Sequence, residues 1–419
     1  MDRDALTYLR WLFFFIVVLL AGLAGLNMFM NPYGHFDSPR INGINKLSLG
    51  FNHRAALTKA LAISRVQPET IILGNSRAET AYDPEHPGFT WRPAYNLALG
   101  GAGLREMRRY FLETLAQGRV RHVLLALDLT MLDPAAIDVN TVPEDVLLTD
   151  SSGRSLGNVR QWRRLASLLL SSTATSDSVW TLTHQHKPVA SYFPSGQRNE
   201  SADTEQVVRE GGPRKASRGI ESNFLASSLQ SISAGDFSAY NALMTQLLEM
   251  FSLAAKNNIR ITLITNPIHA REVYLFAAAG LWPEYEKWKR DLVALAAKSP
   301  RPDLIDLWDF SGVSTCTAEA MPPEGKAEAR MHWYRESSHF QKILGDIVLD
   351  KALLGKESAT CPGLGRRLEP DTIEALLAEQ RSALKQWVAA NSVDAAEIDG
   401  MARARGRHPT TLFAPGAVR

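Results

Sequence analysis

One serine of this chain lies where nucleophilic chemistry could take place. Ser76 follows the apolar run 71–73 and the turn Gly74-Asn75, in the stretch ILGNSRAE. The run predicts a buried strand, and a serine at the turn after a strand can offer its hydroxyl and its backbone N–H to a reacting carbonyl. Such a serine is also a common cap or turn residue. A nucleophilic role therefore requires a base and an orienting acid elsewhere in the chain.

The motif ESSH at 336–339 provides a candidate base together with its orienting acid. In a turn that leads into a helix, residues three apart can bring the Glu336 carboxylate to Nδ1 of His339, which fixes the tautomer and stabilises the imidazolium. The alternative is a helix cap, in which one of the two intervening serines caps a helix that begins near His339. His269, at the end of a strand, and His332 are rival bases.

Short apolar strands alternate with amphipathic helices along most of the chain. We expect strands at 70–74, 93–99, 120–127, 258–266 and 303–310, and helices at 54–65, 104–117, 237–257, 277–298, 339–354 and 369–390. This alternation predicts a parallel sheet with helices on both faces. In such sheets a site lies beyond the carboxyl ends of the strands, so the stretches 74–77, 100–103, 128–131 and 265–269 should converge.

The order of these features resembles the SGNH (GDSL-like) hydrolase superfamily. In that family a Ser follows the first strand, a Gly the second and an Asn the third, and an Asp-x-x-His motif lies near the C-terminus. The matching residues are Gly74-Asn75-Ser76, Gly100-Gly101 and Glu336-x-x-His339, with Glu in place of Asp. The resemblance covers roughly residues 70–355. It implies an α/β fold with a three-layer, flavodoxin-like parallel sheet behind one N-terminal transmembrane helix.

The resemblance also implies a role for each matching residue. Ser76 would be the nucleophile, His339 the base and Glu336 its orienter, with no metal or cofactor. The amide of Ser76 and the amide of Gly100 or Gly101 would donate to the oxyanion.

One block departs from the family pattern. Asp128 follows the third strand, where the family has an Asn. An Asn side chain can donate a hydrogen bond to an oxyanion, whereas an ionised Asp cannot. Asn96 and Asn266 are the alternative donors. Loss of one such donor typically costs about 2.7–4 kcal/mol of transition-state stabilisation.

Polar residues at the same strand ends are candidates for substrate binding. Arg77 could hold a phosphate, uronate or carboxylate group of a polymer. The alternative is a structural ion pair with Glu79 or Asp128. Asp128, Asn266 and His269 are expected to line the same cleft.

The N-terminal segment 11–30 is twenty residues long, with Asn27 as its one strongly polar residue. At about 1.5 Å per residue it matches a hydrocarbon core of roughly 30 Å. It predicts an uncleaved, single-pass anchor in the inner (cytoplasmic) membrane, and a cleaved signal peptide is the alternative. Arg3 and Arg10 precede the segment, so we expect residues 1–10 in the cytoplasm and the remaining ~390 residues outside it.

The remaining segments are expected to be a stalk at 31–53, the SGNH-like domain at 54–365, a C-terminal helix at 366–398 and a disordered tail at 399–419. Residues 140–235 break the alternation, with one helical piece at 157–171 and a stretch at 194–219 that is expected to be flexible. They predict an insertion near the site, either a lid or a partner-binding loop. Outside the membrane Cys316 and Cys361 could form a disulfide, and two unpaired thiols are the alternative.

The net charge of +2 does not imply a long-range field for nucleic acid. One anchor before an extracytoplasmic SGNH-like domain is similar to accessory proteins of cell-envelope polymer acylation, which work beside a multi-span membrane-bound O-acyltransferase. The resemblance implies acyl transfer to an envelope polysaccharide through an acyl-Ser76 intermediate. The alternatives are a catalytically decayed scaffold of the same fold and a hydrolase directed at lipid or peptidoglycan.

Overall fold

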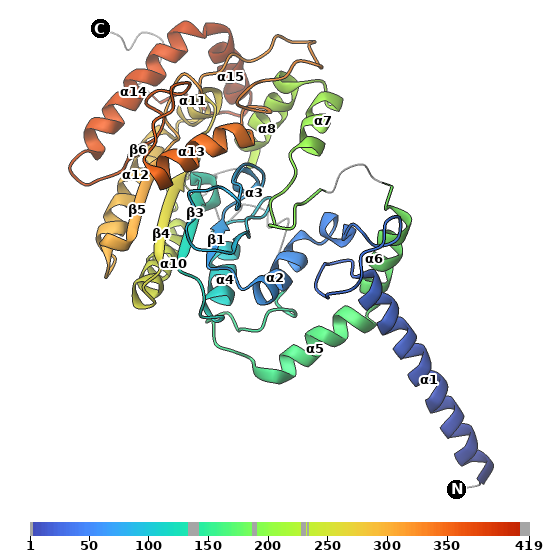
Figure 1. Ribbon diagram of the computed structural model, residues 1–419. Helices are drawn as coiled ribbons and strands as arrows, with labels where there is room; N and C mark the ends of the chain where they lie inside the picture. Colours follow the sequence, from blue (N-terminus) through green and yellow to red (C-terminus); the bar gives the residue numbers. More distant parts are fainter. Residues whose placement is uncertain (1–2, 133–141, 187–190, 228–231, 233, 411–419) are drawn as a thin grey trace. The chain divides into compact units, whose positions relative to one another are not determined.

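The computed structural model describes residues 3–132, 142–186, 191–227, 232 and 234–410 (Figure 1). The start of the expected insertion at 140–141, some of its inner positions and the last nine residues of the expected tail lie outside the described residues. The chain forms two compact units. The first contains residues 1–67, 112–118 and 142–193, and the second contains residues 68–111, 119–141 and 194–419.

A six-stranded sheet forms the centre of the second unit. Its strands are β1 (Thr70–Leu73), β2 (Ala94–Asn96), β3 (His122–Leu127), β4 (Arg260–Thr265), β5 (Ile305–Asp309) and β6 (Arg366–Arg367). They are ordered β2-β1-β3-β4-β5-β6; β1 to β5 are parallel, and β6 pairs antiparallel with β5. The expected mixed α/β class with a mostly parallel sheet is confirmed.

The strands form where the sequence is apolar on both faces. Every residue of β1 and β3 is buried, as in parallel sheets that helices cover on both sides. On one face Ile72, Leu124 and Ile264 share a core cluster with side chains from α3 (Ser76–Ala81) and α13 (Lys342–Leu354). Alternate residues point to the other face, where α10 (Ser238–Lys256) contacts β4.

The other helices of the sheet-containing unit are α4 (Leu104–Leu115, whose last residues belong to the first unit), α7 (Ser201–Arg209), α8 (Pro213–Ser227), α11 (Ala270–Ala278), α12 (Trp282–Ala297), α14 (Ile373–Ala390) and α15 (Ser392–Ala404). The helix expected at 277–298 is confirmed as α12 but begins only at Trp282, because α11 ends at Ala278 before Gly280. Gly280 has a φ of 78°, the left-handed conformation that commonly follows a helix. Pro283 then occupies the first turn of α12, where proline is favoured.

Two further boundaries differ from expectation. The strand expected at 93–99 ends at Asn96, because its side-chain Oδ1 accepts a hydrogen bond from the Ala98 amide at 3.0 Å and starts a turn. The tail expected to be disordered from 399 is helical up to Ala404. Its order follows from packing: α15 contacts α11 and buries Ile398 and Ala402.

The first unit consists mainly of α1 (Arg3–Met30), α2 (Ala55–Val66), α5 (Gly157–Leu170) and α6 (Ser172–Thr183). α1 is long and apolar enough to cross a membrane, which fits a single-pass anchor. The helical piece expected at 157–171 is confirmed as α5, and α6 follows it within the expected insertion. Both helices contact α1 within the first unit.

The expected stalk at 31–53 is also folded. Asn45 is buried, and its side chain donates to the carbonyls of Phe29 at 2.7 Å and Pro39 at 2.8 Å. A short 3₁₀ helix (Leu49–Asn52) precedes α2. Buried side-chain amides satisfy the loop's backbone groups and keep the segment compact.

Gly345 gives the first test of the fold. A Cβ at Gly345 in α13 would lie 2.2 Å from the carbonyl oxygen of Ala81 in α3. We expect Gly345→Ala to lower the free energy of unfolding by about 1–3 kcal/mol, because the two helices would have to separate. Urea unfolding of the detergent-solubilised chain measures this.

Gly400, a helix-interior glycine in α15 with open space around it, is the matched control. Gly400→Ala should be neutral or gain up to about 1 kcal/mol, and equal losses in both variants would contradict the close packing.

Cys316 and Cys361 form a disulfide in the second unit. We expect no free thiol when the purified, denatured and unreduced protein is titrated with a thiol reagent. Cys316→Ser together with Cys361→Ser should cost about 2–5 kcal/mol of stability, because the bridge restricts the unfolded chain. A titration of two thiols per chain would show that the bridge does not form in the cell.

Candidate active site

Ser76 is the first residue of α3 and lies at the carboxyl edge of the sheet. The side chain of Asn75 caps the helix by accepting a hydrogen bond from the Arg77 amide at 3.0 Å. A Cβ at Gly74 would lie 2.5 Å from Cβ of Ala78 and 3.2 Å from that of Ala126. Glycine is therefore required for α3 to start so close to β3. The site lies where β1 and β3 are neighbours, the point at which the strand order reverses.

The acid and the base come from one tight loop before α13. The loop is closed by a bridge between Tyr334 and Phe340 and by the Arg335 amide, which donates to the His339 carbonyl at 2.9 Å. α13 begins only at Lys342. The helix expected from residue 339 is therefore wrong at its start, and neither loop serine caps it.

Ser76, His339 and Glu336 form a hydrogen-bonded chain. Ser76 Oγ lies 2.7 Å from His339 Nε2, and His339 Nδ1 contacts Glu336 Oε1. Glu336 is 3% exposed and accepts further hydrogen bonds from the amides of Ser338 at 2.7 Å and His339 at 3.1 Å.

Burial alone would raise the pKa of Glu336, but His339 and the Ser338 amide outweigh it, so the pKa lies below its usual range. An ionised carboxylate can only accept, so His339 Nδ1 carries the proton. His339 Nε2 is then free to accept the proton of Ser76, which is the arrangement of a serine nucleophile with its general base.

Arg77 is buried and belongs to the framework of the site. Its guanidinium pairs with Asp128 at 2.9 Å and with Glu272, and it donates to the Ser338 carbonyl and hydroxyl, each at 2.7 Å. The two carboxylates hold the pKa of Arg77 above its usual range despite burial, which opposes the charge. The expected alternative, a structural ion pair with Asp128, is what the structure shows. Arg77 also lines one of the cavities at Ser76, and its expected contact with substrate stays a prediction.

Asp128 joins three strand ends. Its Oδ2 accepts from the side-chain amides of Asn75 at 2.9 Å and Asn266 at 3.0 Å, and Asn266 accepts from the Tyr82 hydroxyl at 2.9 Å. Asp128 and Asn266 are both buried. They therefore hold the site together, and their expected contact with substrate stays a prediction.

Two expected oxyanion donors have other partners. The Gly100 amide donates to Glu79 at 3.1 Å. The side-chain amide of Asn96 is buried and donates to the carbonyls of Ala78 at 2.9 Å and Tyr82 at 3.0 Å. Gly101 is not among the residues that line the cavities around Ser76 within the described chain. The backbone amide of Ser76 remains as a candidate donor to the oxyanion, because the first N–H groups of a helix have no partner within the helix.

His269 is excluded as the base by its contacts. It caps α11, with Nδ1 accepting from the Arg271 amide at 3.1 Å and Nε2 donating to the Glu319 carbonyl at 2.6 Å. Burial lowers its pKa to about 4. His269 is therefore a neutral structural histidine. His332 is exposed and outside the hydrogen-bonded chain of Ser76.

Two cavities meet at Ser76 and His339. One, of about 230 Å³, is lined by Arg198, Asp203 and other residues of the α7 region. The other, of about 290 Å³, is lined by Phe224 of α8 and by Leu275 of α11, among others. Ile220 of α8 lines both cavities. These lining residues were missed in the sequence because their segment is polar and rich in Gly and Ser; the apolar spacing of Ile220 and Phe224 is the signal that could have revealed an amphipathic helix.

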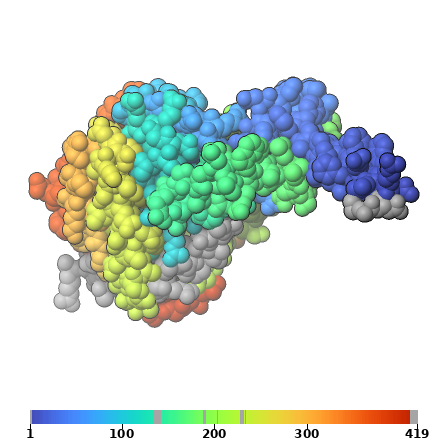
Figure 2. Space-filling view, turned by 90° about the horizontal axis from the view of Figure 1, so that it is seen from below, coloured from blue at the N-terminus to red at the C-terminus, as the bar shows by residue number. Residues whose placement is uncertain are grey.

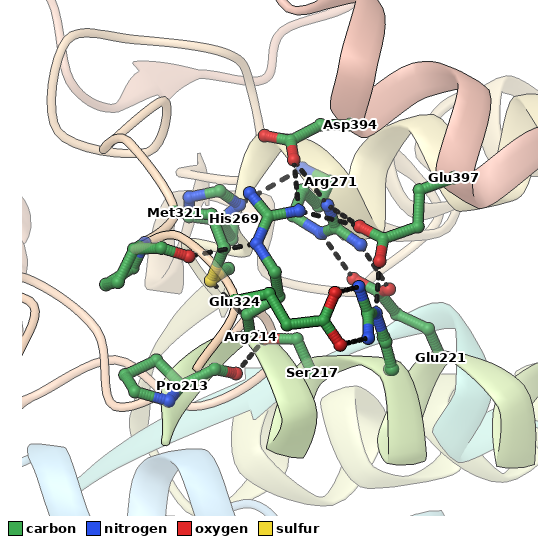
Figure 3. A network of polar contacts seen from close by, with 12 residues as sticks. Pro213, Arg214, Ser217, Glu221, His269, Arg271, Met321, Glu324, Asp394 and Glu397 are labelled. Carbon is green, nitrogen blue, oxygen red and sulfur yellow. Dashed lines mark hydrogen bonds and ion pairs between the residues drawn. The ribbon is translucent and has the colours of Figure 1, made fainter. Parts of the chain in front are cut away.

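α8 is held in place by buried ion pairs (Figure 3). Arg271 of α11 is fully buried and pairs with Glu221 of α8 at 2.8 Å. The same guanidinium pairs with Asp394 at 2.8 Å and Glu397 at 2.9 Å, both on α15. Arg214 of α8 also pairs with these two acids. The C-terminal helix thus fixes the helix that lines both cavities.

Comparisons with known proteins assign neither a family nor a function to this chain. No family model matches the chain, and no curated protein matches it. Among solved structures, "a putative platelet activating factor from Streptococcus pneumonia" aligns over 73% of this chain and 92% of its own, with 12% identity and a TM-score of 0.32. A TM-score this low carries no weight for fold or function. Within the described residues no group of three or more His, Cys, Asp or Glu could hold a metal ion.

Asp128 gives a test of the framework. We expect Asp128→Asn to lower the free energy of unfolding by about 3–5 kcal/mol, because an amide cannot pair with Arg77 and accept from Asn75 and Asn266 at once. It should also give no gain in ester hydrolysis, although it introduces the residue type of the SGNH pattern. Chemical denaturation and an esterase assay on the same preparation measure both.

Asp303 is the matched control, since its ion pair is exposed. Asp303→Asn should change stability by about 1 kcal/mol or less. If Asp128→Asn is as harmless as the control, or increases the hydrolytic rate, the framework role of Asp128 is wrong.

Proposed function

We propose that this chain is a serine acyltransferase or esterase of the SGNH type, with Ser76 as its nucleophile. The observation that carries the proposal is the 2.7 Å contact between Ser76 Oγ and His339 Nε2, with His339 oriented by the buried Glu336. A serine that only ended a strand would not need a base whose other nitrogen is held by an ionised acid.

The geometry supports acyl transfer in two steps. Ser76 Oγ attacks the carbonyl carbon of an acyl donor, and its proton passes to His339 Nε2 while Glu336 stabilises the imidazolium. The bond to the leaving group then breaks, and the leaving group takes that proton. An acceptor hydroxyl, or water in an esterase, attacks the acyl-Ser76 ester, His339 again takes the proton, and Ser76 is released protonated. The Ser76 amide is the donor for the oxyanion.

The strand order supports the SGNH assignment. The order β2-β1-β3-β4-β5 is that of flavodoxin-like doubly wound sheets, in which ligands bind at the switch point of the order. Ser76 follows β1 at that point. The expected Glu336-x-x-His339 motif lies close enough to act on it.

The anchor and the cavities support acyl transfer at a cell envelope, and the polysaccharide acceptor is proposed from the resemblance to proteins of envelope polymer acylation. The membrane helix α1 supports action at a cell envelope, on a polysaccharide acceptor on the extracytoplasmic side. Two cavities at one nucleophile suit a transferase, since the acyl group and its acceptor can approach from different sides. A multi-span membrane-bound O-acyltransferase is the partner that would supply the acyl group.

A second candidate function is a catalytically decayed scaffold of the same fold. The observation that favours it is that two expected oxyanion donors bind other groups. The Gly100 amide donates to Glu79, and the side-chain amide of Asn96 donates to backbone carbonyls. A site with one amide donor would be slower by about 10²–10³-fold for each donor lost.

Labelling with a fluorophosphonate distinguishes the two candidates. We expect the purified full chain to be labelled, and Ser76→Ala to lose the label, because the activated hydroxyl is removed. The matched control is Ser252→Ala; Ser252 lies in α10, where its hydroxyl donates to the Leu248 carbonyl at 2.9 Å. An unlabelled wild-type chain, combined with normal polymer acylation in Ser76→Ala cells, would favour the scaffold and overturn the enzyme.

The orienting acid gives an independent test. Glu336→Gln should lower the rate of ester cleavage by about 10⁴-fold, because a neutral amide neither holds the tautomer of His339 nor stabilises its charged form. The rate of a soluble aryl ester, measured beside the folded state by circular dichroism, tests this. A loss below about tenfold with an intact fold would remove Glu336 from the mechanism.

A further inference from the structure

α5 carries an exposed apolar stripe in the first unit. Val159 is 65% exposed, Trp162 70% and Leu170 41%. Together with exposed Ala166 they follow the spacing of one helix face, and the opposite face is buried through Leu168. Figure 2 shows α5, in pale green, lying open on the surface.

α5 is tied to the end of the membrane helix. Asn27 of α1 is fully buried, and its side-chain amide donates to the Leu169 carbonyl at 2.9 Å and to the Thr175 hydroxyl at 3.1 Å. Its side-chain oxygen accepts from Ser178 at 2.8 Å. The one strongly polar residue of the apolar segment is therefore satisfied where α5 ends and α6 begins.

The length of α1 fixes the depth of this contact. Residues 11–22 are exposed along their whole length, and burial begins only at 23–24 and continues at Asn27 and Met30. Residues 3–10 of α1 are exposed too, but they include Arg3, Asp4 and Arg10 and precede the apolar segment. The exposed part of the apolar segment, residues 11–22, spans about 18 Å, which is shorter than a hydrocarbon core of about 30 Å. The last eight residues of α1, on which α5 and α6 pack, must supply the remaining 12 Å or so. The start of α6 and the end of α5 therefore lie at the boundary of the bilayer.

The charge around the stripe fits such a boundary. Between Asp150 and Asp177 the chain has four arginines and no acid. Arg163 is exposed next to the apolar stripe. A helix with tryptophan and aliphatic residues on one side and arginine beside them is typical of the interface of a membrane with anionic lipids.

We propose that α5 lies on the surface of the bilayer that α1 crosses, with the stripe of Val159, Trp162, Ala166 and Leu170 inserted among anionic lipid headgroups. The proposal depends on α1 crossing that bilayer and is independent of the chemistry at Ser76. It gives the first unit two membrane contacts, a span and an interfacial helix, so the unit cannot rotate freely about α1.

Single-cysteine variants of the full chain test the proposal. The native cysteines are paired, so each introduced thiol can be labelled alone with an environment-sensitive nitrobenzoxadiazole dye. The variants are Val159→Cys and Ala166→Cys on the stripe, Val18→Cys in α1 and, as the exposed control, Val393→Cys on α15, where Val393 is 76% exposed. The labelled chains are reconstituted into phosphatidylglycerol–phosphatidylcholine vesicles that contain lipids with a quencher near the headgroup or deep in the acyl chain.

At positions 159 and 166 we expect blue-shifted emission and quenching of the fluorescence by the shallow quencher. At position 18 we expect quenching by the deep quencher. At position 393 we expect no blue shift and no quenching by either lipid. Emission at 159 and 166 that matches position 393 would overturn the proposal. Stripe positions that are unquenched in lipid vesicles but shielded from thiol reagents in native membranes would also overturn it, in favour of a protein partner. An unquenched position 18 would overturn it too, because α1 would not cross the bilayer.

Discussion

The buried ion pair between Arg77 and Asp128 is the interaction on which the site depends. Arg77 follows the nucleophile directly, and its guanidinium also donates to the carbonyl and hydroxyl of Ser338 in the loop that carries the base. Asp128 binds the side chain of Asn75, which precedes the nucleophile. One charge pair therefore fixes the distance between two segments far apart in the chain. Such pairs are costly to bury, so their value here is the position that they impose on Ser76 and His339.

A second set of charges builds the surroundings of the nucleophile. α8 lines both cavities, and the Arg271 network ties it to α11 and α15. The C-terminal helix thus has a structural role in the site, although it contributes no residue to the cavities among those described. Because these cations and acids are largely buried and pair with several partners at once, α8 is held more firmly than a lid on a mobile loop would be.

The two units have different physical tasks. The sheet-containing unit holds the Ser76 site, whereas the first unit surrounds the end of an apolar helix that is long enough to span a bilayer. In the first unit the buried side chain of Asn27 connects α1 with α5 and α6. An unsatisfied amide in an apolar environment would be unfavourable, which explains why the helices pack at Asn27.

The sequence alone determined the features that depend on neighbours within a few residues. The apolar run before Ser76, the three-residue spacing of Glu336 and His339, the α/β alternation and the apolar segment at 11–30 are of this kind, because strand and helix periodicity are local properties. Only the tertiary structure decided which polar groups bind one another through hydrogen bonds and ion pairs. Ser76 and His339 are 263 positions apart, and Arg77 and Glu272 are 195 apart. Whether Gly100, Asn96 or Arg77 is free for a substrate depends on such distant partners, and a linear pattern contains no record of which donor meets which acceptor once the chain has folded.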